Sequence, residues 1–353
     1  MPSFRTQRVV EILEARPGIQ RVGLDDDSRA YALTALIGPV SVGDDVVVNT
    51  TAVDLGLGTG GWHVVHWNLA HRHLHLPGPG HIMKVRYTSL QADTGAAEES
   101  DAGASAADPD APLPDLGGVP VLVGSLHSQL GVAAVVVKSL RPDLRVSYVM
   151  TDGAALPLAI SDLVAGLVGR ALLDGTVTAG HAFGGDLEAV SVPSAIHLAV
   201  ERQRADVVIC TMGPGVVGTA SPLGTTATEV ASIVTAAQAL GARPVVMCRA
   251  SSADPRERHH GLSHHTRTAL HLTPTPVDVV LPPELSDEVA GLAPHRARVV
   301  DPPDIGAMLR DVDLRITTMG RGPDVDPLFF RAAAAAARHA VSSVGMSDTV
   351  GAP

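Results

Sequence analysis

From Val119 onward, short apolar segments alternate with amphipathic ones, a pattern that few folds accommodate. The apolar segments begin near Val119, Arg145, Thr176, Asp206, Pro244, Val277, Arg298 and Leu314. They are apolar on both faces, as strands are in a parallel sheet that helices cover on both sides. We therefore predict that residues 119–353 form a Rossmann-like α/β domain, with a mostly parallel sheet and helices on both faces. Eight strand–helix units could also close into a barrel, which is the alternative architecture.

The amphipathic segments between these strands have helical periodicity. One apolar stripe comprises Leu163, Val164, Leu167, Val168, Ala171 and Leu172, and another comprises Val230, Ile233, Val234, Ala237 and Leu240. Thr226 and Glu229 have the spacing of a capping box at the start of the second helix, and Gly241 is a stop signal at its end. The pair Asp326-Pro327 predicts the start of a last helix, which runs to about Ser342.

Residues 1–91 have the sequence character of a small β-barrel. Short β-branched and apolar runs cover Val9–Leu13, Gln20–Leu24, Ala30–Leu36, Asp45–Thr50, Trp62–Trp67 and Ile82–Tyr87, and turn signals separate them. Residues 92–118 consist mainly of Ala, Asp, Ser, Gly and Pro, which offer too little apolar area to fold alone. We predict a barrel domain over 1–91, an acidic linker over 92–118 and the α/β domain over 119–353.

Charge and cysteine content exclude several classes of protein. The net charge of −11 comes largely from the linker, which holds seven acidic residues and no basic one. The barrel holds eight basic and eight acidic residues, so it lacks the basic excess of nucleic-acid-binding proteins and we expect no nucleic-acid partner. No stretch reaches the roughly 20 apolar residues of a membrane span. With two cysteines and no recognisable signal peptide, we expect a cytoplasmic protein of unspecified oligomeric state.

Polar loops containing glycine follow nearly every predicted strand of the α/β domain. Because the carboxyl ends of parallel strands share one edge of a sheet, these loops would line a cleft. The side chains that they would bring together are His127, Asp152, His181, Asp186, Arg249, Asp254 and Arg321. The alternative is that these residues only cap helices and turn the chain.

The loop Gly213–Gly218 follows a buried strand, and a similar loop, Thr317–Gly322, occurs about a hundred residues later. The first loop has the glycine spacing of a dinucleotide-binding fingerprint. No helix begins at its third glycine and no acidic residue follows some 20 positions later, so we expect no dinucleotide there. The loop instead predicts a nest of N–H groups for a phosphate or carboxylate. The predicted binding residues are Gly213, Gly215, Gly218 and Thr219.

Histidines gather in two segments. In the first, His71, His73 and His75 alternate and would share one face of a strand, but no carboxylate or cysteine accompanies them as zinc sites often require. The second segment, Asp254–His265, mixes carboxylates, guanidinium groups and imidazoles. This mixture is typical of anion binding by arginine with a histidine as general acid or base, and of divalent-metal sites. The metal-ligand candidates are Asp254, His260 and His264; Ser263 could instead cap a helix through Leu270.

Seven segments distributed over both predicted domains carry a family resemblance. They are GHIMKVRYTSLQ (80–91), GSLHSQL (124–130), YVMTDGAALP (148–157), GHAFGGDLEAVSVPSA (180–195), MGPGVVGT (212–219), ADPRERHHGLSHHT (253–266) and TTMGRGPDVDP (317–327). Together they resemble an uncharacterised bacterial family, domain of unknown function 3866. The resemblance implies that both domains form one unit. It implies no activity and assigns no role to any residue.

These patterns lead to a functional hypothesis. The α/β domain would bind a small anionic ligand, a nucleotide or phosphorylated metabolite, at its strand ends and would act as a hydrolase or transferase. The proton carrier would be His127, His181 or His264, oriented by Asp152 or Asp254, and the anion would be held by Arg256 and Arg321. The alternative is a non-catalytic regulator that senses a ligand in the α/β domain and contacts a protein or nucleic-acid partner through the barrel.

Overall fold

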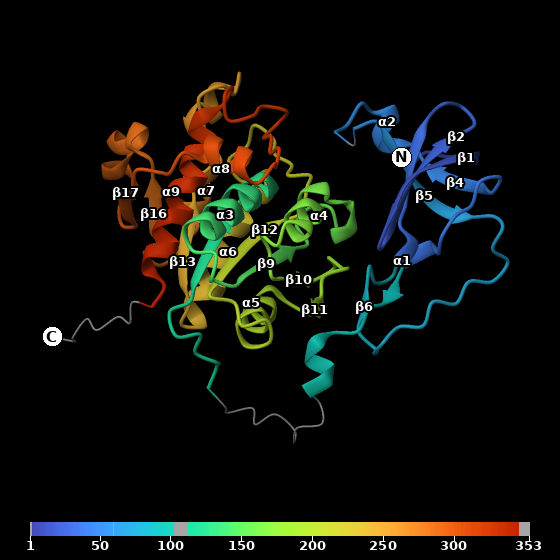
Figure 1. Ribbon diagram of the computed structural model, residues 1–353, viewed down its shortest axis with the longest axis horizontal. Coiled ribbons are helices and arrows are strands. Elements are labelled where there is room, and N and C mark those ends of the chain that lie inside the picture. Colours follow the sequence, from blue (N-terminus) through green and yellow to red (C-terminus); the bar gives the residue numbers. More distant parts are fainter. Residues whose placement is uncertain (1, 59, 102–111, 346–353) are drawn as a thin grey trace. The chain divides into compact units, whose positions relative to one another are not determined.

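The computed structural model describes residues 2–58, 60–101 and 112–345. The chain divides into two compact units, Met1–Gly95 and Ala96–Pro353 (Figure 1). The first residues of the predicted linker carry short elements, the strand β7 (Ala92–Asp93) and a 3₁₀ helix at Ala97–Asp101. The part of that linker formed by residues 102–111 lies outside the described residues.

The first unit is a closed barrel of five strands in the order β1-β2-β3-β5-β4. The strands are β1 (Phe4–Arg16), β2 (Ile19–Leu24), β3 (Arg29–Ala32), β4 (Asp45–Asn49) and β5 (Trp62–Asn68). Only the β3–β5 pairing is parallel among these described strands. Alternate residues such as Val22, Ala30 and Val48 fill the barrel and are fully buried, which confirms the predicted β-barrel.

Three further short elements belong to this unit. Helix α1 (Thr34–Ile37) follows β3, and helix α2 (Thr51–Asp54) follows β4. Strand β6 (Met83–Lys84) pairs with β7 in a two-stranded sheet that is separate from the barrel sheet. The long strand β1 pairs with both β2 and β4, and two irregularities in its register with β2 let it bend around the barrel.

The second unit contains an eight-stranded sheet in the order β11-β10-β9-β12-β8-β13-β16-β17, and every pairing in it is parallel. The strands are β8 (Pro120–Gly124), β9 (Val146–Thr151), β10 (Gly175–Ala179), β11 (Leu187–Ala189), β12 (Val207–Met212), β13 (Arg243–Met247), β16 (Asp278–Leu281) and β17 (Arg296–Val299). A separate pair, β14 (Ala250–Ser251) and β15 (Gly261–Leu262), follows β13. The sheet has two open edges, so the alternative of a closed (β/α)₈ barrel is wrong.

Helices cover both faces of this sheet. One face packs against α3 (His127–Leu140), α4 (Asp162–Gly169), α8 (Ile305–Asp311) and α9 (Pro327–Ser343). The other packs against α5 (Val192–Glu201), α6 (Glu229–Ala239) and α7 (His264–His271). This arrangement confirms the predicted Rossmann-like α/β fold. None of the described helices is long and apolar enough to cross a membrane.

The order of the strands creates a switch point between β8 and β12. From β8 the chain passes through α3 to β9, whereas from the adjacent β12 it passes through α6 to β13 on the far side of β8. The two connecting helices consequently lie on opposite faces. Their divergence opens a crevice at the carboxyl ends of β8 and β12, the place where open α/β sheets bind ligands.

Two local predictions are wrong. The apolar segment at Leu314 is not a strand; Leu314 and Ile316 instead pack under the helices of one face, with Ile316 against α3. The expected capping box does not form either, because Thr225 caps the first turn and the Glu229 carboxylate binds Thr151. Ser263 does cap α7, since its hydroxyl accepts a hydrogen bond from the His265 amide.

Candidate functional site

The parallel sheet brings the loops after β8, β9, β10, β12 and β13 to one edge. Their polar side chains form three groups rather than one. We call these the switch-point crevice, beside His127; the carboxyl pair, Asp152 and Glu229; and the histidine–arginine cluster. The cluster comprises Arg249, Asp254, Arg256, His259, His264, His265 and Arg321.

The switch-point crevice is a cavity of about 390 Å³. Its walls are the start of α3, the glycine loop at Pro214–Val216 and the segment Leu314–Met319. Gly213 allows this loop to pass close to its neighbour, because a Cβ there would lie 2.6 Å from the Ala155 carbonyl oxygen. Residues of both similar glycine loops thus line the same cavity.

His127 begins α3 and borders this crevice. Its Nε2 lies 2.7 Å from the Ser161 hydroxyl, and its Nδ1 lies 3.3 Å from the Tyr148 hydroxyl. Burial lowers the pKa of His127 to about 4, so the imidazole is neutral near pH 7. Because both ring nitrogens have protein partners, His127 joins β9 and α4 to the start of α3 in this state.

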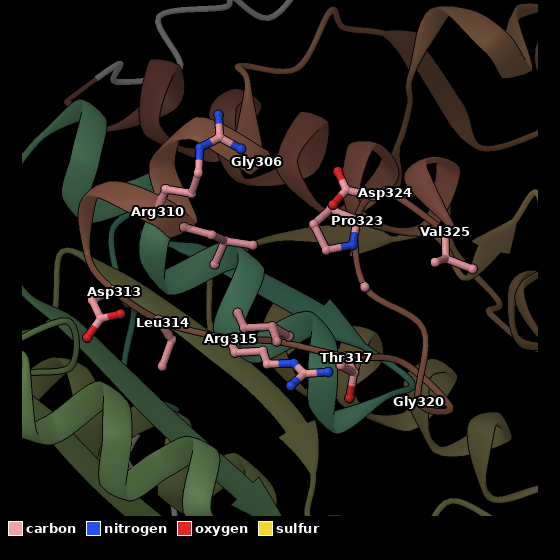
Figure 2. A pocket seen from close by; sticks show the side chains of 13 residues that line it. Gly306, Arg310, Asp313, Leu314, Arg315, Thr317, Gly320, Pro323, Asp324 and Val325 are labelled. Atoms are coloured by element: carbon pink, nitrogen blue, oxygen red, sulfur yellow. The ribbon is translucent and has the colours of Figure 1, made fainter.

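A second pocket of about 580 Å³ shares the segment Leu314–Thr317 with the crevice. Figure 2 shows Arg310 from α8 on one side of it and Arg315 from the shared segment on the other. Asp313 and Asp324 also line it, so the pocket carries charges of both signs. It therefore has no net preference for an anion.

The carboxyl pair lies where β9 ends. The Thr151 hydroxyl donates to both carboxylate oxygens of Glu229, at 2.9 and 3.0 Å, and Asp152 accepts a hydrogen bond from the backbone N–H of His181. Burial, and then the nearby Asp152 charge, raise the pKa of Glu229 to about 7, although the bond from Thr151 opposes the shift. Glu229 is therefore a group that exchanges protons near neutral pH, whereas its position in the sequence predicts only a helix cap.

Asp186 does not belong to this edge. Its carboxylate accepts hydrogen bonds from the backbone and the hydroxyl of Thr176, at the amino end of β10. The parallel pairing of β10 with β11 places Asp186 just before β11 begins. The expectation that it lines the cleft is wrong.

In the histidine–arginine cluster, buried carboxylates form ion pairs with several arginines. Arg256 binds Asp254 through two hydrogen bonds of 2.9 and 2.8 Å, and Arg321 binds the fully buried Asp326 at 3.1 Å. Arg249 and Arg321 lie 3.8 and 3.6 Å from Asp254. These contacts hold Asp254 ionised and its pKa far below the usual range, chiefly through the hydrogen bond from Arg256.

Three imidazoles lie beside these arginines, and their rings are 4.4–4.9 Å apart. They belong to His259, His264 and His265, whereas the predicted metal ligand His260 is exposed and outside the group. Burial, and then the neighbouring Arg249 charge, lower the pKa of His259 to about 4 and that of His265 to about 3. Burial also lowers the pKa of His264. All three rings are consequently neutral near pH 7.

The glycine loop extends from the crevice to this cluster. A Cβ on Gly218 would lie 3.1 Å from His265 Nε2, so the missing side chain lets the loop touch the imidazole. Thr219 is occupied within the loop, because its N–H donates to the Gly224 carbonyl and its hydroxyl accepts from the Ser221 N–H. Gly213 and Gly218 thus allow close approach, Gly215 provides a backbone φ of +112°, and the Thr219 amide is not directed outward.

Other predicted candidates remain apart from these groups. Among the described residues, His259, His264 and His265 are the group of three metal-ligating side chains, and His71, His73 and His75 form none. Cys210 and Cys248 are buried thiols. Burial raises the pKa of Cys248 to about 12 and that of Cys210 well above its usual range, so neither is a reactive thiolate at neutral pH.

Comparison with known proteins adds a family but no activity. No curated protein and no solved structure shows a significant match to the chain. A family described as protein of unknown function (DUF3866) matches residues 29–337, which include parts of both units and nearly all of the strand-end loops. Because the match covers most of its length, the chain belongs to the DUF3866 family.

Proposed function

We propose that the α/β unit binds a small anionic ligand, a nucleotide or a phosphorylated metabolite, at the carboxyl ends of its strands. The observation that carries this proposal is the surplus of positive charge in the histidine–arginine cluster. Burial, and then the nearby charge of Arg256, lower the pKa of Arg249 to about 10, and Arg321 and Arg258 add to this effect. Asp254 and Asp326 balance only part of that charge.

Burial is the largest cause of this pKa shift, and the part that comes from Arg256, Arg321 and Arg258 reflects like charges held near Arg249. A phosphate or carboxylate among them would relieve this repulsion and accept hydrogen bonds from guanidinium groups. The structure therefore favours an anion over a neutral ligand at this position. Arg256 and Arg321 keep donors beyond those that bind Asp254 and Asp326, because a guanidinium has five N–H groups.

The rest of the ligand would occupy the switch-point crevice. Two loops support this placement of the ligand, because each loop lines the crevice and also reaches the histidine–arginine cluster. Gly215 and Val216 line the cavity while Gly218 touches His265, and Met319 lines the cavity while Arg321 binds Asp326. A cavity of about 390 Å³ is within the usual range for small-molecule sites.

We further propose that the α/β unit converts this ligand as a hydrolase or transferase. Glu229 is the group best suited to proton transfer at this edge, because its pKa of about 7 lies near the working pH. Asp152 stays beside it as a second carboxylate. His264 is the candidate proton carrier of the cluster in the metal-free chain, whereas His127 would first have to release a partner of its ring.

A thermal-shift screen of the full chain against nucleotides, sugar phosphates and acyl-CoA tests ligand binding. A ligand at about 100 times its Kd adds about 2.7 kcal/mol of stability. Titration calorimetry on the folded variants then locates the site: Arg256→Ala and Arg321→Ala should each weaken binding by about 1.5–3 kcal/mol. The control is Arg267→Ala, since this exposed arginine on α7 binds Glu288 instead. An affinity equal to that of the wild type in all three variants would refute the role of Arg256 and Arg321 in holding the anion.

One observation favours the non-catalytic alternative. On the barrel, Tyr31 stacks on Trp62 with ring centroids 4.9 Å apart, and Arg21 and Arg29 lie over these rings. In barrels of five strands the face of the second and third strands binds oligonucleotides, and aromatic and arginine side chains stack on unpaired bases. If the protein is such a regulator, the full chain should bind single-stranded RNA or DNA. Trp62→Ala should weaken that binding, and binding that persists unchanged would oppose this reading.

A further inference from the structure

We propose that His259, His264 and His265 bind a divalent transition metal of the zinc class through their ring nitrogens. The geometry of the three side chains supports this site independently of the ligand. Contact between this metal and an anionic ligand is a further part of the proposal, and that part rests on the proposed function.

The spacing of the three histidines fits a single small ion. One ring nitrogen from each lies within 4.8 Å of the other two. A point therefore exists no more than about 2.8 Å from all three (4.8 Å divided by √3). Zinc–nitrogen bonds measure about 2.0–2.1 Å, so each ring needs to move inward by about 0.7 Å at most.

Two of the ring nitrogens in this group lack hydrogen-bond partners in the described part of the chain. His259 and His265 are 1% and 3% exposed, so both are almost wholly removed from water. Within the described part of the chain, His264 Nε2 and His265 Nε2 are buried and have no hydrogen-bond partner. Buried polar atoms without partners are rare in folded proteins because they lose water and gain nothing. A bound metal would satisfy both nitrogens at once.

A hydrogen bond orients the His259 ring as a metal site requires. His259 Nδ1 lies 2.7 Å from the Ser263 hydroxyl, which leaves its Nε2 for a metal. The Ser263 hydroxyl also caps α7, and this helix carries His264 and His265 as its first two residues. A ligating histidine that donates its other ring N–H to an oxygen is the usual arrangement in metal sites.

His265 requires one rearrangement. Arg249 lies 2.9 Å from His265 Nδ1 and can only donate, so the ring proton resides on Nε2 in this state. A metal at Nε2 moves that proton to Nδ1 and turns Arg249 away, toward the Asp254 carboxylate, which is already 3.8 Å distant. Three metal–nitrogen bonds outweigh the one hydrogen bond that is lost.

The donor set indicates which metal would bind and what it would do. Three neutral imidazoles select zinc, cobalt, nickel or copper over magnesium and calcium, which prefer oxygen. Three protein ligands leave a fourth position open, as in catalytic zinc sites. No carboxylate neutralises the ion within this group of three, and Arg249 and Arg256 add positive charge nearby. An anionic ligand at the open position would offset that charge, so metal and anion should each strengthen the binding of the other.

Cobalt titration of the untagged full chain, after treatment with a chelator, tests the site. The wild type should bind one equivalent of Co²⁺ with the visible absorption of four-coordinate cobalt, and Zn²⁺ should displace it. His264→Gln should weaken Co²⁺ binding by more than about a hundredfold, beyond the loss typical of an outer-shell partner. His260→Gln is the matched control, because this exposed neighbour of His259 lies outside the group. His265→Asn provides a second variant, and circular dichroism verifies that each variant is folded.

Each outcome decides the proposal. Binding lost in His264→Gln and His265→Asn but kept in His260→Gln supports the site. Absence of Co²⁺ and Zn²⁺ binding, or equal binding in all variants, overturns it. If the anionic ligand still stabilises the metal-free chain in a manner that depends on Arg321, the metal site fails and the proposed function stands. If metal binds and no anion does, the metal site stands and the proposed function fails.

Discussion

Replacing Glu229 by glutamine should remove a pH dependence of stability that this carboxyl group creates. Burial raises its pKa from 4.5 to about 7 in the folded chain. At about 1.4 kcal/mol for each pH unit, this difference corresponds to about 3 kcal/mol of unfolding free energy. Glutamine keeps the size of the side chain and can still accept a hydrogen bond from Thr151, but it cannot ionise.

The direction in which the unfolding free energy changes with pH follows from proton binding. Between about pH 4.5 and 7 the folded chain holds the Glu229 proton and the unfolded chain does not, so the unfolding free energy falls as pH rises. Above the folded pKa both states are ionised and the loss is complete. Relative to the wild type, Glu229→Gln should therefore gain roughly 2 to 3 kcal/mol between about pH 5 and pH 8.

Chemical denaturation at several pH values measures this difference. Both tryptophans, Trp62 and Trp67, lie in the barrel, so tryptophan fluorescence reports barrel unfolding. Far-ultraviolet circular dichroism mostly reports the helices of the α/β unit, where the shift should appear. The same pH dependence in wild type and variant would refute the argument that burial of Glu229 raises its pKa.

Three further substitutions test the framework of the site. The fully buried Gln129 side chain makes four hydrogen bonds, to Ser125 N, Leu126 N, Met247 O and Cys248 O. At about 1 kcal/mol for each bond, Gln129→Met should lower the free energy of unfolding by about 4 kcal/mol, as measured by chemical denaturation. Asp326→Asn should cost about 3–5 kcal/mol because it removes the charge of the fully buried carboxylate to which Arg321 donates, whereas the exposed Asp324→Asn should cost little. Gly180 has φ +63° and a Cβ there would lie 2.3 Å from Asp152 Oδ2, so Gly180→Ala should cost at least about 1–2 kcal/mol, and a neutral result would contradict this close approach.

The sheet was predictable because its strands are apolar on both faces and regularly spaced. The same rule gave a false strand at Leu314, where the apolar side chains are buried by helices rather than by sheet neighbours. Periodicity records that a segment is buried but not what covers it. Strand β11 is not among the predicted strands, because its three residues are too few to show a hydrophobic pattern.

The site was predictable where its residues follow one strand closely. Residues 249–265 form a short hairpin, a 3₁₀ turn and the start of α7, all close together in the chain, so their proximity could be expected from the sequence. Which of two adjacent histidines turns inward could not, because the 3₁₀ turn at Glu257–His259 buries His259 and leaves His260 exposed. The spacing of Thr226 and Glu229 predicts a helix cap, whereas the actual partner of Glu229, Thr151, is 78 residues away in the sequence.

Hydrogen exchange of the full chain, with and without the anionic ligand that stabilises it most, tests directly whether the strand-end edge is the functional site. We predict slower exchange in the loops 213–218, 249–265 and 314–321, because these segments form the crevice and the histidine–arginine cluster. Slowing confined to the barrel, residues 4–95, or to the opposite edge of the sheet would contradict the account.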